Sequence, residues 1–341
     1  MRALAAILVL ALCAGCESVS YYGQAVGGHF RLLAAARPVD SWIADPATPP
    51  ELKGRLETAQ RIRQFASREL HLPDNASYTT YADLGRRFAV WNVFAAPRFS
   101  VDPKPECFPF TGCVGYRGFF SEREAQRYAE KLRAEGYDVY VGGVLAYSTL
   151  GWFDDPLLST FIRYPDAQVA RLVFHELAHQ LVYAKNDTTF NESFAVTVEE
   201  EGVRRWLEAE GRTSALAAFH VAQARKRELA ARIKETRERL KAIYAMDLPA
   251  EQMLEQKRGE LERLRAAFPT VVPAEPNNAF LVSIALYSEL VPGFERLLAA
   301  AGSLDAFYER ARQLAASGRT GRESLLAQRP AQESGMSTIL R

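Results

Sequence analysis

Residues 175–195 read HELAHQLVYAKNDTTFNESFA, and this stretch decides how the rest of the chain can fold. His175 and His179 are four residues apart, so their imidazoles lie on the same face if the segment is helical. An apolar run surrounds them: Val169, Leu172, Val173, Leu177, Leu181 and Val182. Apolar residues on most sides of a helix indicate that it is buried. The sequence therefore predicts a buried helix that presents two imidazoles side by side.

Two imidazoles at this spacing can bind one zinc ion, for which neutral imidazole is a preferred ligand. Glu176 lies beside them, where its carboxylate can hold a water without binding the metal. Zinc lowers the pKa of bound water to about 7, and Glu176 can then move a proton from that water to a leaving amine. The chain has only five histidines, so a chance occurrence of this pattern is rare. We expect His175 and His179 to be zinc ligands and Glu176 to be the general base.

The third metal ligand is expected on the next helix, which is predicted to start near Asn191. Twelve residues separate His179 from Glu192, which lies in the segment Asn191-Glu-Ser-Phe-Ala195. Two histidines and one glutamate leave a fourth position on zinc for water, as catalytic sites require. The expected reaction is hydrolysis of a peptide bond by zinc-activated water.

The first residues are expected to be removed on export. Arg2 precedes the apolar run Leu4–Leu12, which is too short to span a bilayer, so residues 1–15 are predicted to be a signal peptide. The segment Leu12-Cys-Ala-Gly-Cys16 resembles the lipobox of bacterial lipoproteins, which implies lipidation of Cys16. Glu17 follows it, which implies the periplasmic face of the outer membrane of the bacterial envelope. The alternative is an ordinary cleaved signal and a released product.

Two further cysteines, Cys107 and Cys113, lie in a short loop that contains Pro109 and Gly112. An exported protein occupies an oxidising compartment, where such a pair usually forms a disulfide. A metal site is the alternative, but no histidine lies near the two cysteines in the sequence. We therefore predict a Cys107–Cys113 disulfide.

The charge balance excludes one class of partner. Lys and Arg together number 42, Asp and Glu together 41, and the net charge is +1. No basic tract with interleaved aromatic residues occurs, so no nucleic-acid partner is expected.

The pattern HELAHQ…NESFA resembles that of the gluzincin metallopeptidases, a resemblance that implies the ligand and base roles given above. A wider set of features accompanies this pattern: the lipoprotein start, Tyr21-Tyr22, the Cys107/Cys113 loop and residues 146–156 (AYSTLGWFDDP). With HELAHQ and NESFA, they resemble a family of bacterial lipoproteins named putative aminopeptidases, a resemblance that implies an exopeptidase. The alternatives are a zinc endopeptidase of the cell envelope and, from another class, a non-catalytic zinc-binding envelope lipoprotein.

Residues 16–341 are expected to form a single zincin-like peptidase domain of the α+β class, mainly helical with a small sheet. Short strands are predicted within residues 77–120, and another over 138–148. Residues 196–267, rich in Ala, Leu, Glu, Lys and Arg, are predicted to form a long helical hairpin. The tail, residues 318–341, is expected to be loosely ordered.

Peptide substrates are expected to add as a strand beside residues 139–149, where Gly142 and Gly143 would permit close approach. Asp154 and Asp155 could bind the α-ammonium of an aminopeptidase substrate, although a turn or helix cap is an equal alternative.

Two other features could serve the reaction. Glu199, Glu200 and Glu201 lie on a predicted helix surface, where one of them could orient a ligand histidine. Tyr287 is the candidate for stabilising the oxyanion, with core packing as the alternative.

Overall fold

The computed structural model describes residues 21–108 and 112–322. The predicted signal peptide, residues 1–15, and the predicted lipidation site Cys16 lie outside these residues. Among the helices that the structure describes, none combines the length and apolar character needed to cross a membrane.

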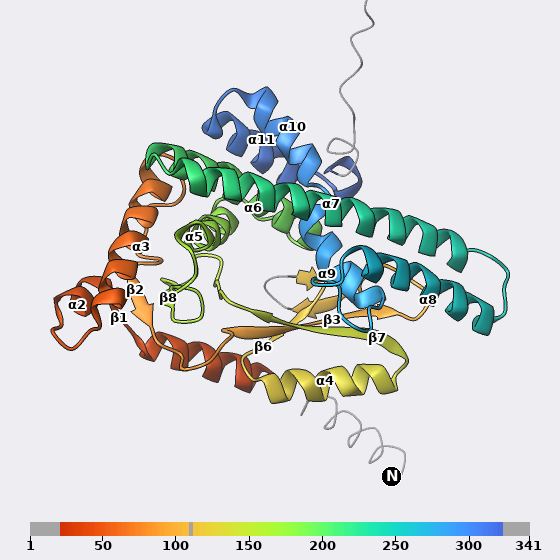
Figure 1. Ribbon diagram of the computed structural model, residues 1–341. Helices are drawn as coiled ribbons and strands as arrows, with labels where there is room; N and C mark the ends of the chain where they lie inside the picture. Colours follow the sequence, from red (N-terminus) through yellow and green to blue (C-terminus); the bar gives the residue numbers. More distant parts are fainter. Residues whose placement is uncertain (1–20, 109–111, 323–341) are drawn as a thin grey trace, which may run out of the picture.

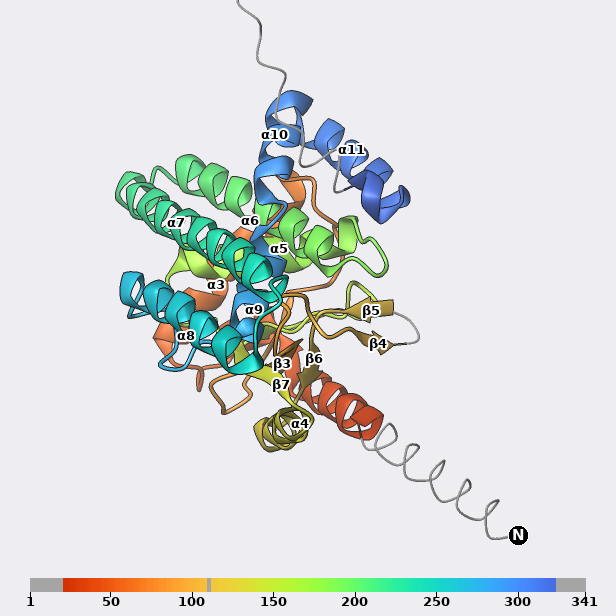
Figure 2. The ribbon, with the colours of Figure 1, turned by 90° about the vertical axis from the view of Figure 1, so that its right-hand side faces the viewer.

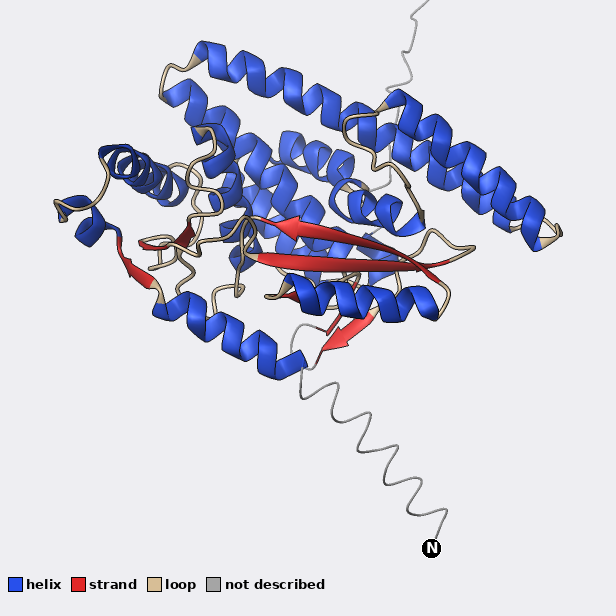
Figure 3. Ribbon diagram, turned by 60° about the horizontal axis from the view of Figure 1, so that its bottom comes forward, coloured by secondary structure: helices blue, strands red, loops and turns tan. Residues whose placement is uncertain are grey.

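The main sheet is antiparallel and lies between helices (Figures 1 and 3). Its strands are β6 (Arg117–Phe119), β3 (Val90–Pro97) and β7 (Tyr137–Val144), in that order, and the covering helices are α4 (Glu122–Ala134) and α9 (Asn278–Ser288). Successive β3 side chains point to opposite faces. Trp91, Val93 and Ala95 pack against α4, whereas Phe94 and Ala96 pack against α9. Because both faces are covered, the central strand is almost entirely apolar.

Two smaller sheets accompany the main one. The first contains β1 (Ala36–Pro38), β2 (Thr80–Ala82) and β8 (Leu157–Leu158), with β2 in the centre. The second is the hairpin of β4 (Glu106–Phe108) and β5 (Gly112–Val114). A disulfide between Cys107 and Cys113 joins the two hairpin strands and confirms that prediction. Short strands are present within residues 77–120, as predicted. The strand predicted over 138–148 is present as β7, but it ends at Val144, four residues earlier than predicted.

The centre of the molecule is a pair of packed helices, α5 (Asp166–Leu181) and α6 (Thr188–Ala209). The two helices themselves carry large fully buried side chains, including Phe174, Phe190, Phe194 and Trp206. Gly202 of α6 permits their close approach, because a Cβ there would lie 2.7 Å from both Leu70 and Phe174. Residues 21–34 are helical and, with α2 (Val39–Ala44) and α3 (Pro50–Arg68), complete the N-terminal part.

A long helical hairpin is present, but its predicted start at residue 196 is wrong. The helix α6 continues to Ala209, and the chain turns at Gly211, which has a φ of 64°. Glycine adopts this left-handed conformation without the Cβ clash of other residues, so the turn ends α6. The hairpin consists of α7 (Thr213–Tyr244) and α8 (Ala250–Ala267), which lie antiparallel (Figure 1).

The C-terminal helices α10 (Val291–Ala301) and α11 (Leu304–Ala316) pack beside α6. The first residues of the predicted tail, 318–322, are held in place, because the Arg322 Nε donates to Asp187 Oδ2 at 2.8 Å. Residues 323–341 lie outside the described part. The architecture is mainly helical with small sheets and is consistent with the α+β class.

Gly143 should be far less tolerant of a side chain than its neighbour Gly142. A Cβ at Gly143 would lie 2.4 Å from the Phe88 ring, whereas at Gly142 the nearest atom is 3.3 Å away, on Tyr140. We expect Gly143→Ala to lower the free energy of unfolding by about 1–3 kcal/mol, the usual cost of overpacking. Urea unfolding of Gly143→Ala and Gly142→Ala measures the difference. Equal stability of the two variants would contradict this assignment.

Candidate active site

Three buried side chains from α5 and α6 converge on one point. His175 and His179 lie one turn apart on α5, and their Nε2 atoms are 3.1 Å apart. Glu192, in the first turns of α6, places its Oε2 3.2 Å from the His175 Nε2 and 3.5 Å from the His179 Nε2. The three predicted metal ligands are therefore brought together, and they form a group that could hold a metal ion.

The triangle of ligand atoms has the dimensions of a zinc site. Zinc binds imidazole nitrogen at about 2.0–2.1 Å, so neighbouring ligands at tetrahedral angles are separated by about 3.3 Å. The observed edges of 3.1, 3.2 and 3.5 Å bracket this value. The donor set and its spacing therefore fit one face of a zinc tetrahedron.

The short connection between α5 and α6 is fixed by Asn191. Its Oδ1 accepts a hydrogen bond from the Ala184 N at 2.7 Å, and its Nδ2 donates to the Ala184 O at 2.9 Å. Asp187 caps α6 by accepting from the Phe190 N at 3.1 Å. Asn191 directly precedes Glu192, the candidate third ligand, so this clamp helps to determine where that carboxylate lies.

The disulfide hairpin packs on the same connection. Asn186, with a φ of 64°, accepts a hydrogen bond from the Cys113 N at 2.7 Å through its Oδ1. The Gly115 N, two residues further along, donates a hydrogen bond to the Thr188 Oγ1 at 3.2 Å. Both contacts tie the chain just before Tyr116 to the start of α6.

Glu199 holds the other nitrogen of His175. Its Oε2 lies 2.8 Å from the His175 Nδ1, and its Oε1 accepts from Arg171 at 3.2 Å. Burial opposes ionisation of Glu199, but the charges of Arg171 and His175 lower its pKa to about 2. Glu199 therefore stays negative and favours the His175 tautomer that carries its proton on Nδ1.

Charge pairing dominates the titration of the ligands. Burial alone would lower the pKa of His175, but hydrogen bonds to Glu192 and Glu199 raise it to about 10. Burial likewise disfavours ionised Glu192, but the imidazoles lower its pKa to about 2. The His179 Nδ1 is buried and has no hydrogen-bond partner within residues 21–108 and 112–322. The cluster is thus built to hold positive charge between its acceptor atoms.

Glu176 lies next to the cluster without joining it. Burial raises the pKa of this carboxyl, although His175 and His179 lower it in part. A raised carboxyl pKa strengthens a general base that must accept and then release a proton near neutral pH.

Two tyrosines border the ligands. Tyr287, on α9, stacks on His175 with ring centroids 6.4 Å apart. Tyr116 follows the disulfide hairpin, outside any strand. Burial, and then the negative charge of Glu192, raises the pKa of both hydroxyls well above 10, so both remain protonated. Tyr287 was a sequence candidate. Tyr116 was missed, because an irregular segment offers no periodic pattern from which to place it.

The two predicted substrate-binding aspartates differ. Asp155 is buried and accepts hydrogen bonds from the Thr149 N and Oγ1, both at 2.9 Å. Burial raises its pKa to about 6. Asp154 is exposed. The Tyr78 N donates to the Asp155 O at 2.6 Å, and Tyr78 has a φ of 65°. The side chain of Asp155 therefore orders the turn of residues 149–155, a structural role that agrees with the alternative prediction.

The predicted glycines lie in β7, where they pair with β3. Gly142 is opposite Asn92 and Gly143 is opposite Trp91. Gly143 allows the Phe88 ring to pack directly against its backbone.

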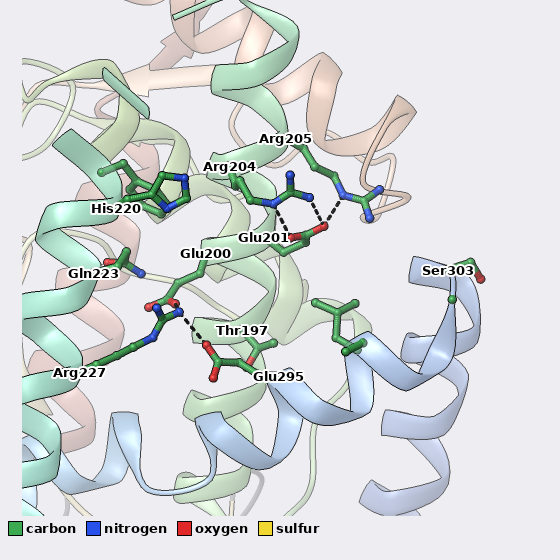
Figure 4. Close-up of a pocket in the computed structure, with 14 residues that line it drawn as sticks. Thr197, Glu200, Glu201, Arg204, Arg205, His220, Gln223, Arg227, Glu295 and Ser303 are labelled. Atoms are coloured by element: carbon green, nitrogen blue, oxygen red, sulfur yellow. Dashed lines mark hydrogen bonds and ion pairs between the residues drawn. The ribbon is translucent and has the colours of Figure 1, made fainter. Parts of the chain in front are cut away.

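Glu200 and Glu201 do not face the metal ligands. They line a cavity of about 420 Å³ between α6, α7 and the C-terminal helices, where Glu200 pairs with Arg227 and Glu201 with Arg204 and Arg205 (Figure 4). None of the three metal-ligand candidates lines this cavity. Of the three consecutive glutamates, Glu199 alone touches a ligand histidine.

A family model described as putative aminopeptidase matches residues 20–326. The chain belongs to this family. The match covers both helices that carry the ligands, the disulfide hairpin and α9. No curated protein and no solved structure shows significant similarity to the chain. Membership of the aminopeptidase family indicates that the protein is a peptidase.

Glu199→Gln should lower the pKa of His175 in the metal-free protein, because it removes the carboxylate charge 2.8 Å from Nδ1. The folded-state pKa lies above the ordinary 6.5, so protonated His175 contributes its full stabilisation below pH 6.5 and loses it as pH rises towards 10. Because its His175 has a lower pKa, the variant should lose this stabilisation at a lower pH than the wild type does. NMR titration of the imidazole Cε1–H signals measures the pKa.

Glu200→Gln is the matched control, because Glu200 is adjacent in sequence but faces the cavity. It should leave the pKa of His175 close to that of the wild type. An equal decrease in both variants would show that Glu199 acts by general charge and not through its hydrogen bond.

Proposed function

We propose that this protein is a zinc-dependent aminopeptidase that hydrolyses peptide bonds with a metal-activated water. The observation that carries the proposal is the triangle of His175, His179 and Glu192, whose edges match a zinc tetrahedron. The family membership supports the peptidase part of the proposal. One ion per chain is expected.

The orientation of His175 is set by a hydrogen bond from the ring nitrogen that does not face the metal position. His175 donates from Nδ1 to Glu199, which leaves its Nε2 lone pair directed at the metal position. Arg171 keeps Glu199 in place through its own hydrogen bond. Protons compete with metal for the same atoms, so metal affinity should fall as pH decreases.

Glu176 is proposed to move the protons. Bound zinc would supply Lewis-acid chemistry, polarising the substrate carbonyl and acidifying the attacking water. Glu176 would take the water's proton and deliver it to the leaving amine. The buried setting that raises its pKa brings that pKa closer to neutrality, which suits both transfers.

Tyr287 and Tyr116 are proposed as hydrogen-bond donors to the developing oxyanion. Each hydroxyl lies close enough to Glu192 and Glu176 to feel their charges, and each stays protonated. A neutral donor held in a dry site stabilises an oxyanion without changing its own charge.

The free edge of β7 is proposed to bind the peptide. The Val144 carbonyl accepts from the Ala89 N towards β3, whereas the Val139 carbonyl accepts from the Asn277 Nδ2 at 3.1 Å. The backbone N–H and C=O groups of successive residues in a strand point to opposite edges. Those of Val141 and Gly143 therefore point to the same edge as the Val139 carbonyl, away from β3. No described strand pairs with this edge. An extended peptide could therefore hydrogen-bond there.

The exopeptidase assignment rests on the family, and Asp154 is the accessible acidic group proposed to meet the substrate's α-ammonium. An envelope endopeptidase is the second candidate, since an open strand edge also accepts the middle of a peptide. A non-catalytic zinc lipoprotein is disfavoured by two observations. The described metal group has three protein ligands, not four, and Glu176 adds a base that structural sites do not need.

The proposed location is the bacterial cell envelope. Lipid on Cys16 would anchor the chain, with the peptidase domain on the periplasmic face of the outer membrane. The Cys107–Cys113 disulfide supports an oxidising compartment.

Glu176→Gln should abolish hydrolysis and retain zinc. Loss of a general base typically costs about 10²- to 10⁴-fold in rate. Metal content and cleavage of a mixed panel of amino-acid amides and internally quenched peptides are measured for both proteins. Cleavage confined to the amides and to N-terminal residues supports an aminopeptidase, and internal cleavage supports an endopeptidase. Absence of zinc from both proteins would contradict the metal site.

Tyr287→Phe should lower kcat by about 10²- to 10³-fold with little change in KM, as expected for an oxyanion donor. Tyr116→Phe is compared in the same assay. Tyr140→Phe is the control, because Tyr140 packs on Phe280. If neither Tyr287→Phe nor Tyr116→Phe differs from the control, the oxyanion assignment is wrong.

A further inference from the structure

The first described helix carries an exposed apolar stripe. Tyr22, Val26 and Phe30 are spaced by four residues, and their exposed fractions are 42%, 52% and 59%. Residues four apart lie on one face of a helix, so the three side chains form a continuous strip.

A second apolar element lies against this helix. Trp152 and Phe153 have exposed fractions of 76% and 48%, and the Phe153 ring is 4.6 Å from the His29 ring. Their loop is ordered by hydrogen bonds, since the Phe153 N donates to the Thr149 Oγ1 at 3.0 Å. The fold thus holds two large aromatic side chains in solvent beside the stripe.

The composition of this helix is unlike that of an ordinary solvated helix. Residues 21–34 contain one charged side chain, Arg31, and no acidic residue. The neighbouring helix α4, which is also partly exposed, has seven charged residues among its thirteen. Water does not favour an exposed face with so little charge, and such patches mark contacts with proteins or membranes.

We propose that Tyr22, Val26, Phe30, Trp152 and Phe153 form a membrane-docking patch that lies against the lipid bilayer. The proposal rests on the lipid anchor proposed above. Cys16 is five residues before Tyr21, so the connecting chain can span at most about 18 Å. A lipid on Cys16 therefore keeps this helix close to the bilayer surface. Trp and Tyr favour that surface, because their rings are apolar at one end and polar at the other.

The arrangement of the helices agrees with this orientation. Residues 21–34 lie at the bottom of the molecule beside α4, and α10 and α11 lie at the top, in both Figure 1 and Figure 2. The same docking would position the active site. A Cβ at Gly151 would lie 3.3 Å from the side chain of Gln180, which follows the ligand His179 on α5. Docking through Trp152 and Phe153 would therefore bring α5, which carries His175 and His179, close to the membrane surface.

Tryptophan fluorescence can test the patch in the full-length lipoprotein. The chain has four tryptophans, and Trp91 and Trp206 are buried, while Trp42 is half-buried. The protein is reconstituted into vesicles of phosphatidylethanolamine and phosphatidylglycerol, with part of the lipid brominated in its acyl chains. We expect bromine quenching in the wild type that is lost in Trp152→Phe.

Val26→Glu should reduce this quenching, because it places a carboxylate at the apolar surface. Val221→Glu is the matched control, since Val221 is an equally exposed helical valine, at 56% against 52%, on α7. It should leave the quenching unchanged. Both positions are exposed, so neither variant should disturb the fold, which circular dichroism checks.

The outcomes separate the patch from the anchor and from the peptidase. Intact mass reports lipid on Cys16, and peptide hydrolysis reports the enzyme. Lipid on Cys16 with equal quenching in wild type and Trp152→Phe would overturn the patch and leave the anchor standing. A raised KM for peptides in Trp152→Phe, without any difference in quenching, would assign the loop to substrate binding and also overturn it. Quenching lost in Trp152→Phe and weakened in Val26→Glu supports the patch, even where hydrolysis fails.

Discussion

His175 lies between two buried carboxylates, and the geometry of the molecule depends on this sandwich. Glu192 meets its Nε2 and Glu199 meets its Nδ1. The two glutamates are seven residues apart on α6, which is close to two helical turns, so they share one face. Burying two carboxylates is costly unless each is paired. The two histidines and Arg171 supply the pairing, and this fixes α6 in rotation and height against α5.

The surrounding elements complete the site from three directions. The disulfide hairpin contacts the connection between α5 and α6 through Asn186 and delivers Tyr116. Helix α9, which covers one face of the main sheet, places Tyr287 against His175. The turn of residues 149–155, ordered by Asp155, lies next to α5, since a Cβ at Gly151 would be 3.3 Å from the Gln180 side chain. A small sheet therefore serves the site mainly by placing the segments that follow its strands.

What could be predicted from the sequence was what local spacing determines. The pair His175 and His179 follows from helical periodicity, and Glu192 from its place early in the next helix. The Cys107–Cys113 disulfide follows from the short loop between the cysteines and from the expectation of export. Tyr116 could not be found, because its position depends on contacts between residues more than seventy positions apart, such as that of Cys113 with Asn186. The predicted start of the helical hairpin was wrong because the sequence is rich in charged residues both before and after Gly211. The turn there is a change in backbone conformation that the composition does not reveal.

The clamp formed by Asn191 has a consequence for the lengths of related sequences. Its side chain binds both the backbone N–H and the backbone C=O of Ala184, which fixes the distance between Ala184 and the start of α6. One residue inserted in the first turn of α6, between Thr188 and Asn191, would rotate the following helical positions by about 100°. Either the clamp or the carboxylate would then miss its target. The number of residues between His179 and Glu192 should therefore be constant, at twelve, among relatives that keep the same site. Loops elsewhere are not subject to this constraint.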